Sequence, residues 1–289
     1  MAQSDFTEAM SSAASGCEMT CEQPVQFTNV MTGRLDYNRY LYHQLKCSMQ
    51  RADRIDMIVS FLMESGVRMV LKDLKQALQR GVQIRILTGN YLGITQPAAL
   101  YLLKKELGDG VDLRFYQDKN RSFHPKSYIF HYPAYSEIYI GSSNISRSAL
   151  TSGIEWNYRF TTKTNPEDFR LFLDTFEDLF SNHAIVIDDA ELRRYSKSWH
   201  KPAVSKDLVR YDMDEPETQT VTVTPLFQPR GAQIEALYAL ADSRAEGATK
   251  ALVQAATGIG KTYLAAFDSA SYEKILFVAH REEILKQGA

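Results

Sequence analysis

Residues 123–131 read FHPKSYIFH, and residues 141–147, at the next glycine turn, read GSSNISR. The first stretch has the pattern of a strand, and alternation along a strand places the side chains of His124 and Lys126 on one face. Gly141 and Ser142 allow the backbone to approach a ligand closely where a strand turns into a helix. These two stretches therefore predict a site that pairs an imidazole with an ammonium group.

The residue types at this site indicate phosphoryl chemistry. A neutral imidazole such as that of His124 can attack phosphorus, and the ammonium group of Lys126 neutralises the anionic oxygens. Asn144 adds a neutral hydrogen-bond donor for the same oxygens. We therefore expect a phosphate ester as the substrate of this site.

The overall charge is close to neutral, with 33 lysines and arginines against 35 aspartates and glutamates among 289 residues. A nucleic-acid-binding surface must therefore be local. Lys119, Arg121 and Arg147 supply positive charge beside the predicted site, although a solvated loop is an equally common role for the first two. Phe123 and Tyr116 are candidates for stacking on bases, but packing in the core is the commoner role of such residues.

No apolar run approaches the roughly 18 residues that cross a membrane, and the first residues lack the basic and apolar regions of a signal peptide. We therefore expect a cytoplasmic protein with no membrane partner. Residues 1–33 are rich in Ser, Ala, Thr and Glu, show no periodicity and predict a disordered tail.

The chain around the motif predicts an α/β fold, because segments of strand period and helix period follow each other. Expected helices cover 35–51, 67–78, 96–107, 165–180 and 188–199, and expected strands cover 55–61, 82–86, 111–115, 127–132, 137–140 and 154–162. Gly81 is placed to end the second helix, and Asn165-Pro166 to begin the fourth. This domain is expected to span residues 34–200.

Residues 201–224 lose the pattern, gather Pro, Asp, Glu and Thr, and predict a linker. Beyond it we expect a helix over 229–244, a strand over 251–254, a glycine loop, a helix from residue 261 and a strand over 275–278. Residues 225–289 are too few for a complete ATPase, so we expect an incomplete P-loop lobe here.

The glycine loop reads AATGIGKT over residues 255–262, close to the phosphate-binding template G-x-x-x-x-G-K-[ST]. Ala255 stands at the first glycine of the template. Backbone N–H groups of Gly258, Ile259 and Gly260 can surround phosphates at the start of a helix. Lys261 would reach the outer phosphates of ATP, and Thr262 would hold Mg²⁺.

His124-x-Lys126 followed by Gly141-Ser142-Ser143-Asn144 resembles the HKD motif of the phospholipase D superfamily. The resemblance covers about residues 34–200 and implies a phospholipase D-like α/β/α sandwich with a mixed sheet. It also implies a catalytic set of His124, Lys126, Asn144, Ser142 and Glu155, in which the glutamate orients the histidine. His131 stands where the family has an aspartate.

The same resemblance implies a metal-independent nuclease that works through a phosphohistidine intermediate and needs no cofactor. The family uses two histidines, one as nucleophile and one as general acid. Only one HxK motif occurs in the chain, since His43 is followed by Gln-Leu-Lys. The resemblance therefore implies a homodimer that shares one active site at its two-fold axis.

The form A-x-T-G-x-G-K-T resembles the start of superfamily 2 DEAD/DEAH-type helicases, especially type III restriction subunits. Gln233 matches their upstream glutamine that reads adenine, and Thr257 completes the ATP-binding set. FVAHREEILKQ resembles their motif Ia, which implies DNA contacts from His280 and Arg281. ATP and Mg²⁺ are the implied cofactors of this portion.

Together these features predict a nuclease acting on DNA that is coupled, in a full-length parent protein, to an ATP-dependent helicase or translocase. Bacterial restriction or phage defence is the role suggested by analogy. One alternative is a catalytically silent HKD domain that serves as a DNA-binding or dimerisation module. A second is a lipid phosphodiesterase, against which the helicase segment and the lack of a membrane-binding helix argue.

Overall fold

The computed structural model describes residues 27–33, 40–118, 121–202, 228–256 and 258–278. Their strands form one eight-stranded sheet. In sheet order these are β1 (Val30–Met31), β7 (Asn157–Thr161), β6 (Tyr135–Gly141), β5 (Lys126–Tyr132), β2 (Arg54–Val59), β3 (Gln83–Thr88), β4 (Val111–Tyr116) and β8 (Ala184–Val186). The β2–β3 and β3–β4 pairs are parallel and the other pairs antiparallel, which confirms the predicted mixed sheet.

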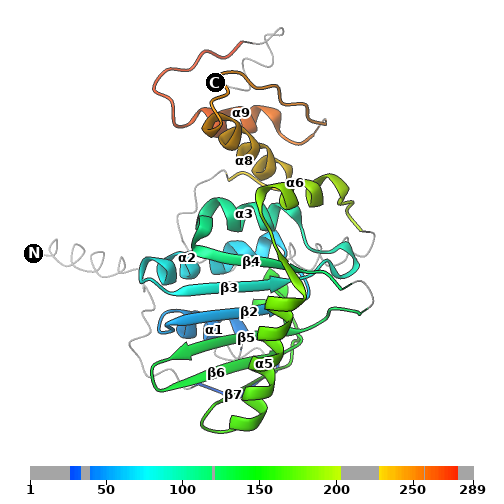
Figure 1. Ribbon diagram of the computed structural model, residues 1–289. Coiled ribbons are helices and arrows are strands. Elements are labelled where there is room, and N and C mark those ends of the chain that lie inside the picture. Colours follow the sequence, from blue (N-terminus) through cyan, green and yellow to red (C-terminus); the bar gives the residue numbers. More distant parts are fainter. Residues whose placement is uncertain (1–26, 34–39, 119–120, 203–227, 257, 279–289) are drawn as a thin grey trace, which may run out of the picture.

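Helices cover both faces of this sheet (Figure 1). The helices are α1 (Leu41–Met49), α2 (Glu64–Gln79), α3 (Pro97–Leu107), α4 (Arg147–Thr151), α5 (Pro166–Asn182), α6 (Asp189–Ser198), α8 (Ala232–Ala245) and α9 (Lys261–Ser269), with short 3-10 turns η2 (Tyr91–Gly93) and η3 (Gly108–Gly110). α1, α2 and α3 pack on one face and α5 lies across the other (Figure 1). The α/β/α sandwich expected from the sequence is therefore present.

Alternation along the strands divides the apolar side chains between two cores. Ile84 and Ile86 of β3 point to the core under α1, α2 and α3, and Leu87 points to the core under α5. The second core is closed by Phe169, Phe176 and other aromatic residues of α5, at the helical spacing that the sequence shows. The aromatic stripe of α5 is therefore a packing surface and not a ligand site.

Several expected elements differ from the observed ones. Residues Val30 and Met31 form β1 and Met31 is buried against β7, so the predicted tail over 1–33 is wrong at these two positions. The expected strands over 251–254 and 275–278 are not formed, and Leu252 and Leu276 are almost fully exposed. A strand needs a hydrogen-bonded neighbour, and among the described residues neither segment has one. Most of the predicted linker lies outside the described residues.

The first helix of the C-terminal portion packs directly on the sheet domain. Ile234 of α8 is buried in the core under α1–α3, and the ring of Tyr238 contacts Tyr101 of α3 at 5.1 Å between centroids. Arg193 of α6 forms an ion pair with Asp242 of α8, with 2.7 Å between nitrogen and oxygen. Thus the predicted second unit begins as an extension of the first core.

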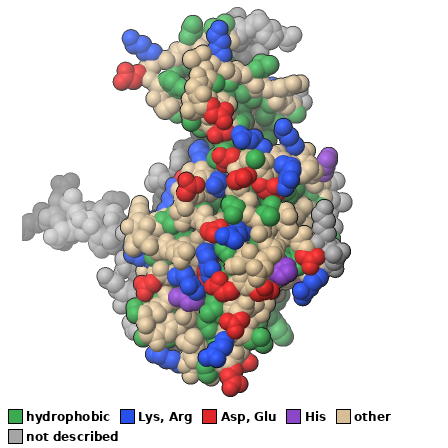
Figure 2. Space-filling model, in the orientation of Figure 1, with side chains coloured by type: hydrophobic (Ala, Val, Ile, Leu, Met, Phe, Trp, Pro, Cys, Tyr) green, Lys and Arg blue, Asp and Glu red, His purple; other side chains and the backbone are tan. Residues whose placement is uncertain are grey.

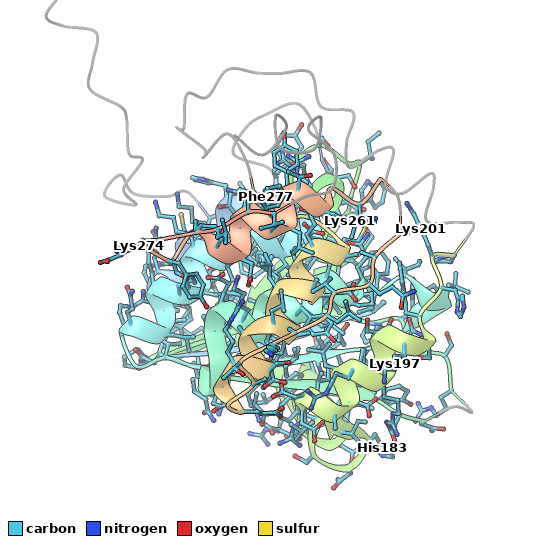
Figure 3. The ribbon with its side chains drawn as sticks, turned by 90° about the horizontal axis from the view of Figure 1, so that it is seen from above. His183, Lys197, Lys201, Lys261, Lys274 and Phe277 are labelled. Carbon is cyan, nitrogen blue, oxygen red and sulfur yellow. The ribbon has the colours of Figure 1, made fainter. Side chains whose placement is uncertain are left out.

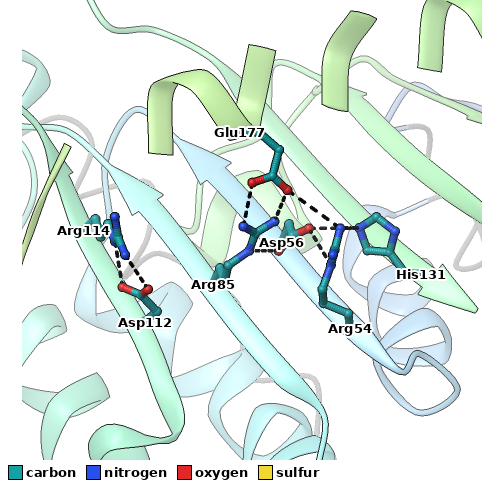
Figure 4. Close-up of polar contacts among 7 residues, drawn as sticks. All are labelled: Arg54, Asp56, Arg85, Asp112, Arg114, His131 and Glu177. Carbon is teal, nitrogen blue, oxygen red and sulfur yellow. Dashed lines mark hydrogen bonds and ion pairs between the residues drawn. The ribbon is translucent and has the colours of Figure 1, made fainter. Parts of the chain in front are cut away.

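A network of charged side chains connects β2, β3, β5 and α5 on the α5 side of the sheet (Figure 4). At its centre, the fully buried Asp56 accepts hydrogen bonds from Arg85 at 2.6 Å and contacts His131 at 2.9 Å. Arg85 also donates to both oxygens of Glu177. Burial would raise the pKa of Asp56, but hydrogen bonds from His131 and Arg85 and the nearby arginine charges hold the pKa below its usual value.

We expect Asp56→Ala to lower the free energy of unfolding by about 3–5 kcal/mol, because the largely buried Arg85 then loses one of its two carboxylate partners. Asp112→Ala removes the more exposed pair with Arg114 and should cost less than about 1 kcal/mol. Urea unfolding at pH 7 measures both. Because the pKa of Asp56 is lower in the folded state, its contribution is present above about pH 4 and is lost as the pH falls further. Equal costs for the two variants would contradict the assignment.

Candidate active site

The predicted site lies at the carboxyl ends of the parallel strands β2 and β3. The sheet register places Lys126, the first residue of β5, opposite Val59, which is itself paired with Thr88 at the end of β3. The loops that follow the carboxyl ends of parallel strands meet at one edge of a sheet, where ligands bind in α/β folds. His124 and Lys126 therefore stand beside the loops after Val59 and Thr88.

His124 and Lys126 contact each other as the sequence predicts. The ammonium nitrogen Nζ of Lys126 lies 2.8 Å from Nδ1 and 3.0 Å from Nε2 of His124, and donates to the His124 carbonyl at 2.9 Å. Lys126 is buried, with 7% of its surface exposed, whereas the imidazole is exposed. The lysine is thus fixed beneath a histidine that a substrate can reach.

The charge states follow from these contacts. Burial, and then the charge of Lys126, lower the pKa of His124, so its imidazole is neutral near pH 7. Burial also lowers the pKa of Lys126, while the carboxylate of Glu155 acts in the opposite direction. A neutral imidazole beside a cation is the combination that nucleophilic attack on a phosphate ester needs.

Asn144 is held by the loop that follows β2. Its Oδ1 accepts hydrogen bonds from the backbone N–H groups of Ser60, at 3.0 Å, and Phe61, at 3.2 Å. Its side chain is 5% exposed. Because the carbonyl oxygen is used as the acceptor, the amide nitrogen Nδ2 is left as the donor that the sequence analysis assigns to this residue.

Glu155 and Ser142 pair with each other. The hydroxyl of Ser142 donates to Glu155 and accepts a hydrogen bond from the Trp156 N–H at 3.0 Å. The polar contacts of His124 go instead to Lys126. Glu155 therefore acts on the site through its charge, which raises the pKa of Lys126. Its expected contact with His124 is not formed.

Sequence reasoning missed Tyr91, whose ring lies 4.4 Å from that of His124 at an angle of 50°. Tyr91 follows β3, more than 30 residues before the histidine, and only the pairing of β3, β2 and β5 brings the two together. No residue pattern near the HxK motif indicates this contact. Loops that follow parallel strands meet at one edge of a sheet. This rule indicates that the loop after β3 lies near the site, but it does not indicate which of its residues contacts His124.

The structure describes two of the five residues that are predicted to contact DNA. Arg121 and Arg147 are exposed, and Lys119, His280 and Arg281 lie outside the described residues. On the face shown in Figure 2, basic and acidic side chains are interspersed and do not gather into a basic patch. Phe123 is buried and stacks on Tyr116 at 4.5 Å, so these two rings pack with each other rather than presenting themselves to bases.

His131, at the position of the family aspartate, is remote from this site. It pairs with Arg54 at the other end of β5, five residues from Lys126, or about 17 Å along the strand. Its ring contacts Asp56 and Ser136. The replaced aspartate therefore does not change the set of groups around His124.

The predicted phosphate-binding loop has positive φ angles at two of its glycines. Gly258 and Gly260 have φ angles of +86° and +77°, and α9 begins at Lys261. The Lys261 ammonium group donates to the carbonyls of Ala255 and Ala256, both at 2.8 Å, and Gln233 donates to the Ile259 carbonyl at 2.8 Å. Figure 3 shows Lys261 at the start of α9.

These contacts bring the predicted ATP-binding residues together, apart from Thr257, which lies outside the described residues. Thr262 follows Lys261 in the first turn of α9. A cation and free N–H groups at the start of a helix suit the phosphates of a nucleotide, and a hydroxyl there suits their Mg²⁺. The residues present therefore fit ATP and Mg²⁺.

Among the residues that the structure describes, no group of three or more His, Cys, Asp or Glu side chains is arranged to hold a metal ion. None of the helices in this part of the chain combines the length and the apolar character needed to cross a membrane.

Comparison with known families identifies both parts of the chain. Residues 45–180 match the model of the family described as cardiolipin synthase, PLD-like domain. Residues 226–289 match that of the type III restriction enzyme, res subunit. The chain thus carries a phospholipase D-like domain followed by a segment of the helicase-type res-subunit family. No curated protein matches the chain.

The solved structures that match the chain share little sequence with it. Nuc, a phospholipase D family member from Salmonella typhimurium, is 20% identical with a TM-score of 0.44, over 55% of this chain and 97% of Nuc. NucT from Helicobacter pylori is 16% identical with a TM-score of 0.40, over 50% of this chain and 89% of NucT. Polyphosphate kinase from Porphyromonas gingivalis is 15% identical with a TM-score of 0.43, over 58% and 25% of the two chains.

We expect Lys126→Met to raise the pKa of His124, because the substitution keeps the aliphatic stem and removes a charge that lowers this pKa. Titration of the imidazole by NMR measures the change. Arg121→Met, which removes an exposed cation nearby, should leave the titration of His124 where it is in the wild type. An unchanged His124 titration in Lys126→Met would contradict the described contact.

Proposed function

We propose that the phospholipase D-like domain is a metal-independent phosphodiesterase that cleaves DNA through a phosphohistidine intermediate. The observation that carries the proposal is the His124–Lys126 pair, with a neutral imidazole 2.8 Å from a buried ammonium group. Lys126 and the amide of Asn144 bind the phosphoryl oxygens and supply the charge stabilisation that a metal ion supplies in other nucleases.

In the first step, His124 attacks phosphorus and a P–N bond forms as the P–O bond to the leaving oxygen breaks. The leaving oxygen takes a proton from the partner subunit's His124, which enters the step as the imidazolium while the attacking His124 is neutral. In the second step, water attacks phosphorus, the P–N bond breaks, and the proton of the water returns to the partner subunit's His124. The products are one strand end with a hydroxyl group and one with a phosphate group.

A shared site in a homodimer is part of this proposal. Among the described residues, the other histidines stand on other segments: His43 in α1, His131 at the far end of β5, His183 after α5 and His200 after α6. Exposed apolar side chains flank Glu155, since Ile154 is 85% and Trp156 is 72% exposed. They provide apolar surface beside the site for a second copy of the chain.

We further propose that this nuclease is coupled to ATP-driven movement along DNA. The match of residues 226–289 to the res-subunit family and the contacts of Lys261 and Gln233 with the loop before α9 support an ATP-binding segment. Restriction or phage defence is the role that this combination favours. The cofactors would be ATP and Mg²⁺ for this portion and none for the nuclease.

The nuclease is tested by incubating supercoiled plasmid with the purified chain in EDTA. We expect nicking by the wild type and a loss of at least about 10³-fold in His124→Ala, because the nucleophile is removed. Gln83→Ala, which changes an exposed residue at the opposite end of β3 from the site, should nick like the wild type.

Three outcomes of this assay would contradict the proposal in different ways. Binding of plasmid without any nicking would favour a DNA-binding module. Turnover of phosphatidylcholine but not of DNA would favour a lipid phosphodiesterase. A chain that sediments only as a monomer and still nicks DNA would exclude the shared site.

For the ATP-binding segment, we expect Lys261→Ala to weaken binding of a fluorescent ATP analogue with Mg²⁺ by at least about tenfold, since the ammonium group contacts the outer phosphates. Lys274→Ala is the matched control, because this exposed lysine lies in the same portion of the chain (Figure 3). Fluorescence anisotropy measures both. Equal affinity in Lys261→Ala and the wild type would rule out a phosphate site at this loop.

A further inference from the structure

The His124 imidazole is in contact with a residue from another loop. Tyr91, in η2, places its ring 4.4 Å from that of His124 at an angle of 50°, and Nζ of Lys126 lies 2.8 and 3.0 Å from the two ring nitrogens. A histidine side chain turns about two bonds, so contacts with two neighbours from different segments together restrict its orientation. The exposed imidazole is therefore held by both Tyr91 and Lys126.

Tyr91 is itself part of a tightly built loop. The Ile94 N–H donates to the Tyr91 carbonyl at 3.0 Å, and Tyr91 packs on a small buried cluster of Phe61, Met63 and Ile94. Between them, Leu92 has a φ of +51°, the one positive value among the non-glycine residues that the structure describes. Such backbone persists where the surroundings determine it, so the loop has a defined conformation.

The same cluster connects the two halves of the phosphate site. Phe61 packs in the cluster with Tyr91, and its backbone N–H donates to Asn144 at 3.2 Å. Tyr91 thus contacts the residue proposed as nucleophile and shares a packing cluster with the residue that holds a proposed oxyanion donor. A shift of this loop would move His124 relative to Asn144.

Helix α6 fastens the loop from outside. The Tyr195 hydroxyl oxygen lies 2.7 Å from both Asn90 Oδ1 and the Thr95 carbonyl oxygen, on either side of η2. The indole nitrogen of Trp199 donates to the Gly93 carbonyl at 2.7 Å. These contacts reach the loop before, within and after the turn that carries Tyr91.

We propose that Tyr91 is a positioning residue for His124, and that α6 keeps it in place through Tyr195 and Trp199. Tyr91 does not touch phosphorus or exchange a proton. It holds the imidazole in the orientation for attack, so the inference rests on the proposed phosphodiesterase function. The charged groups near this imidazole are Lys126, in contact with it, and Glu155, which acts on Lys126.

Helix α6, which holds the loop of Tyr91, also forms hydrogen bonds with α8 of the C-terminal portion. Tyr238 of α8 donates to Asp189 at 2.6 Å, and Ser196 of α6 donates to Glu235 at 2.6 Å. The helix that holds the Tyr91 loop is therefore also bonded to α8. A change in α8 has a physical route to His124 through α6 and η2.

The test compares Tyr91→Ala and Tyr91→Phe in the full chain on a fluorescent DNA duplex in EDTA. We expect Tyr91→Ala to lower kcat by about 10- to 100-fold with KM changed less than about twofold, because a misplaced nucleophile slows the chemical step. Tyr91→Phe keeps the ring and should restore wild-type rates. NMR titration should show a higher His124 pKa in Tyr91→Ala, because burial is the first cause of its lowered value.

Tyr195→Phe keeps the packing of the ring and removes only the hydroxyl contacts, so it should lower kcat in the same direction and by a smaller factor. Tyr272→Phe, at an exposed tyrosine of the C-terminal portion, is the control and should have no effect. Thermal unfolding of each variant identifies any loss of folding. If Tyr91→Ala unfolds, Tyr91→Leu, which keeps an apolar side chain in the cluster and removes the ring, takes its place in the same measurements.

The outcomes separate this inference from the function on which it rests. Full activity and an unmoved His124 titration in Tyr91→Ala, with His124→Ala inactive, would overturn the role of Tyr91 and leave the nuclease intact. Nicking by His124→Ala would overturn the proposed function, whereas the NMR titration would still report whether Tyr91 covers the imidazole. Wild-type kcat in a folded Tyr195→Phe would remove α6 from the proposal.

Discussion

The antiparallel register between β2 and β5 places Lys126 opposite Val59, and the groups proposed for catalysis depend on that pairing. Side chains along a strand alternate between faces, so a slip of one residue would turn Lys126 into the core under α5. His124, which lies on the same face, would turn with it, and the pair would no longer stand beside the loop of Ser60 and Phe61 that holds Asn144. The site therefore depends on the pairing of β2 with β5 as well as on the residues of the motif.

The same register is secured at the other end of β5 by charge. His131 contacts the buried Asp56, and Asp56 is held in turn by Arg85 and, through it, by Glu177 of α5 (Figure 4). A buried carboxylate without these partners would be strongly destabilising, so the network tolerates one pairing of β2 with β5 and penalises others. The histidine at the family's aspartate position therefore contributes to strand pairing, about 17 Å along the strand from the phosphate site.

The sequence predicted most of the sheet domain because its strands and helices are long and periodic. It missed β1, β8 and α4, which have two, three and five residues and are too short to show a period. It wrongly placed strands at 251–254 and 275–278, since apolar composition indicates a strand only where a neighbour pairs with it. At the site, the motif located His124, Lys126 and Asn144, whereas Tyr91 and the Ser142 partner of Glu155 depend on contacts between distant segments.

The proposed nuclease and ATP-binding segments meet on a continuous scaffold. Gln233 lies in the first turn of α8 and contacts the loop before α9, while Ile234 beside it is buried in the core of the sheet domain. These two neighbouring residues of α8 therefore contact different parts of the chain. A rigid helix passes a displacement at one end on to the residues that pack along its length. Because α8 is bonded to α6, and α6 holds the loop of Tyr91, the arrangement of the fold links the predicted phosphate-binding loop to the imidazole of His124 without requiring the two sites to touch.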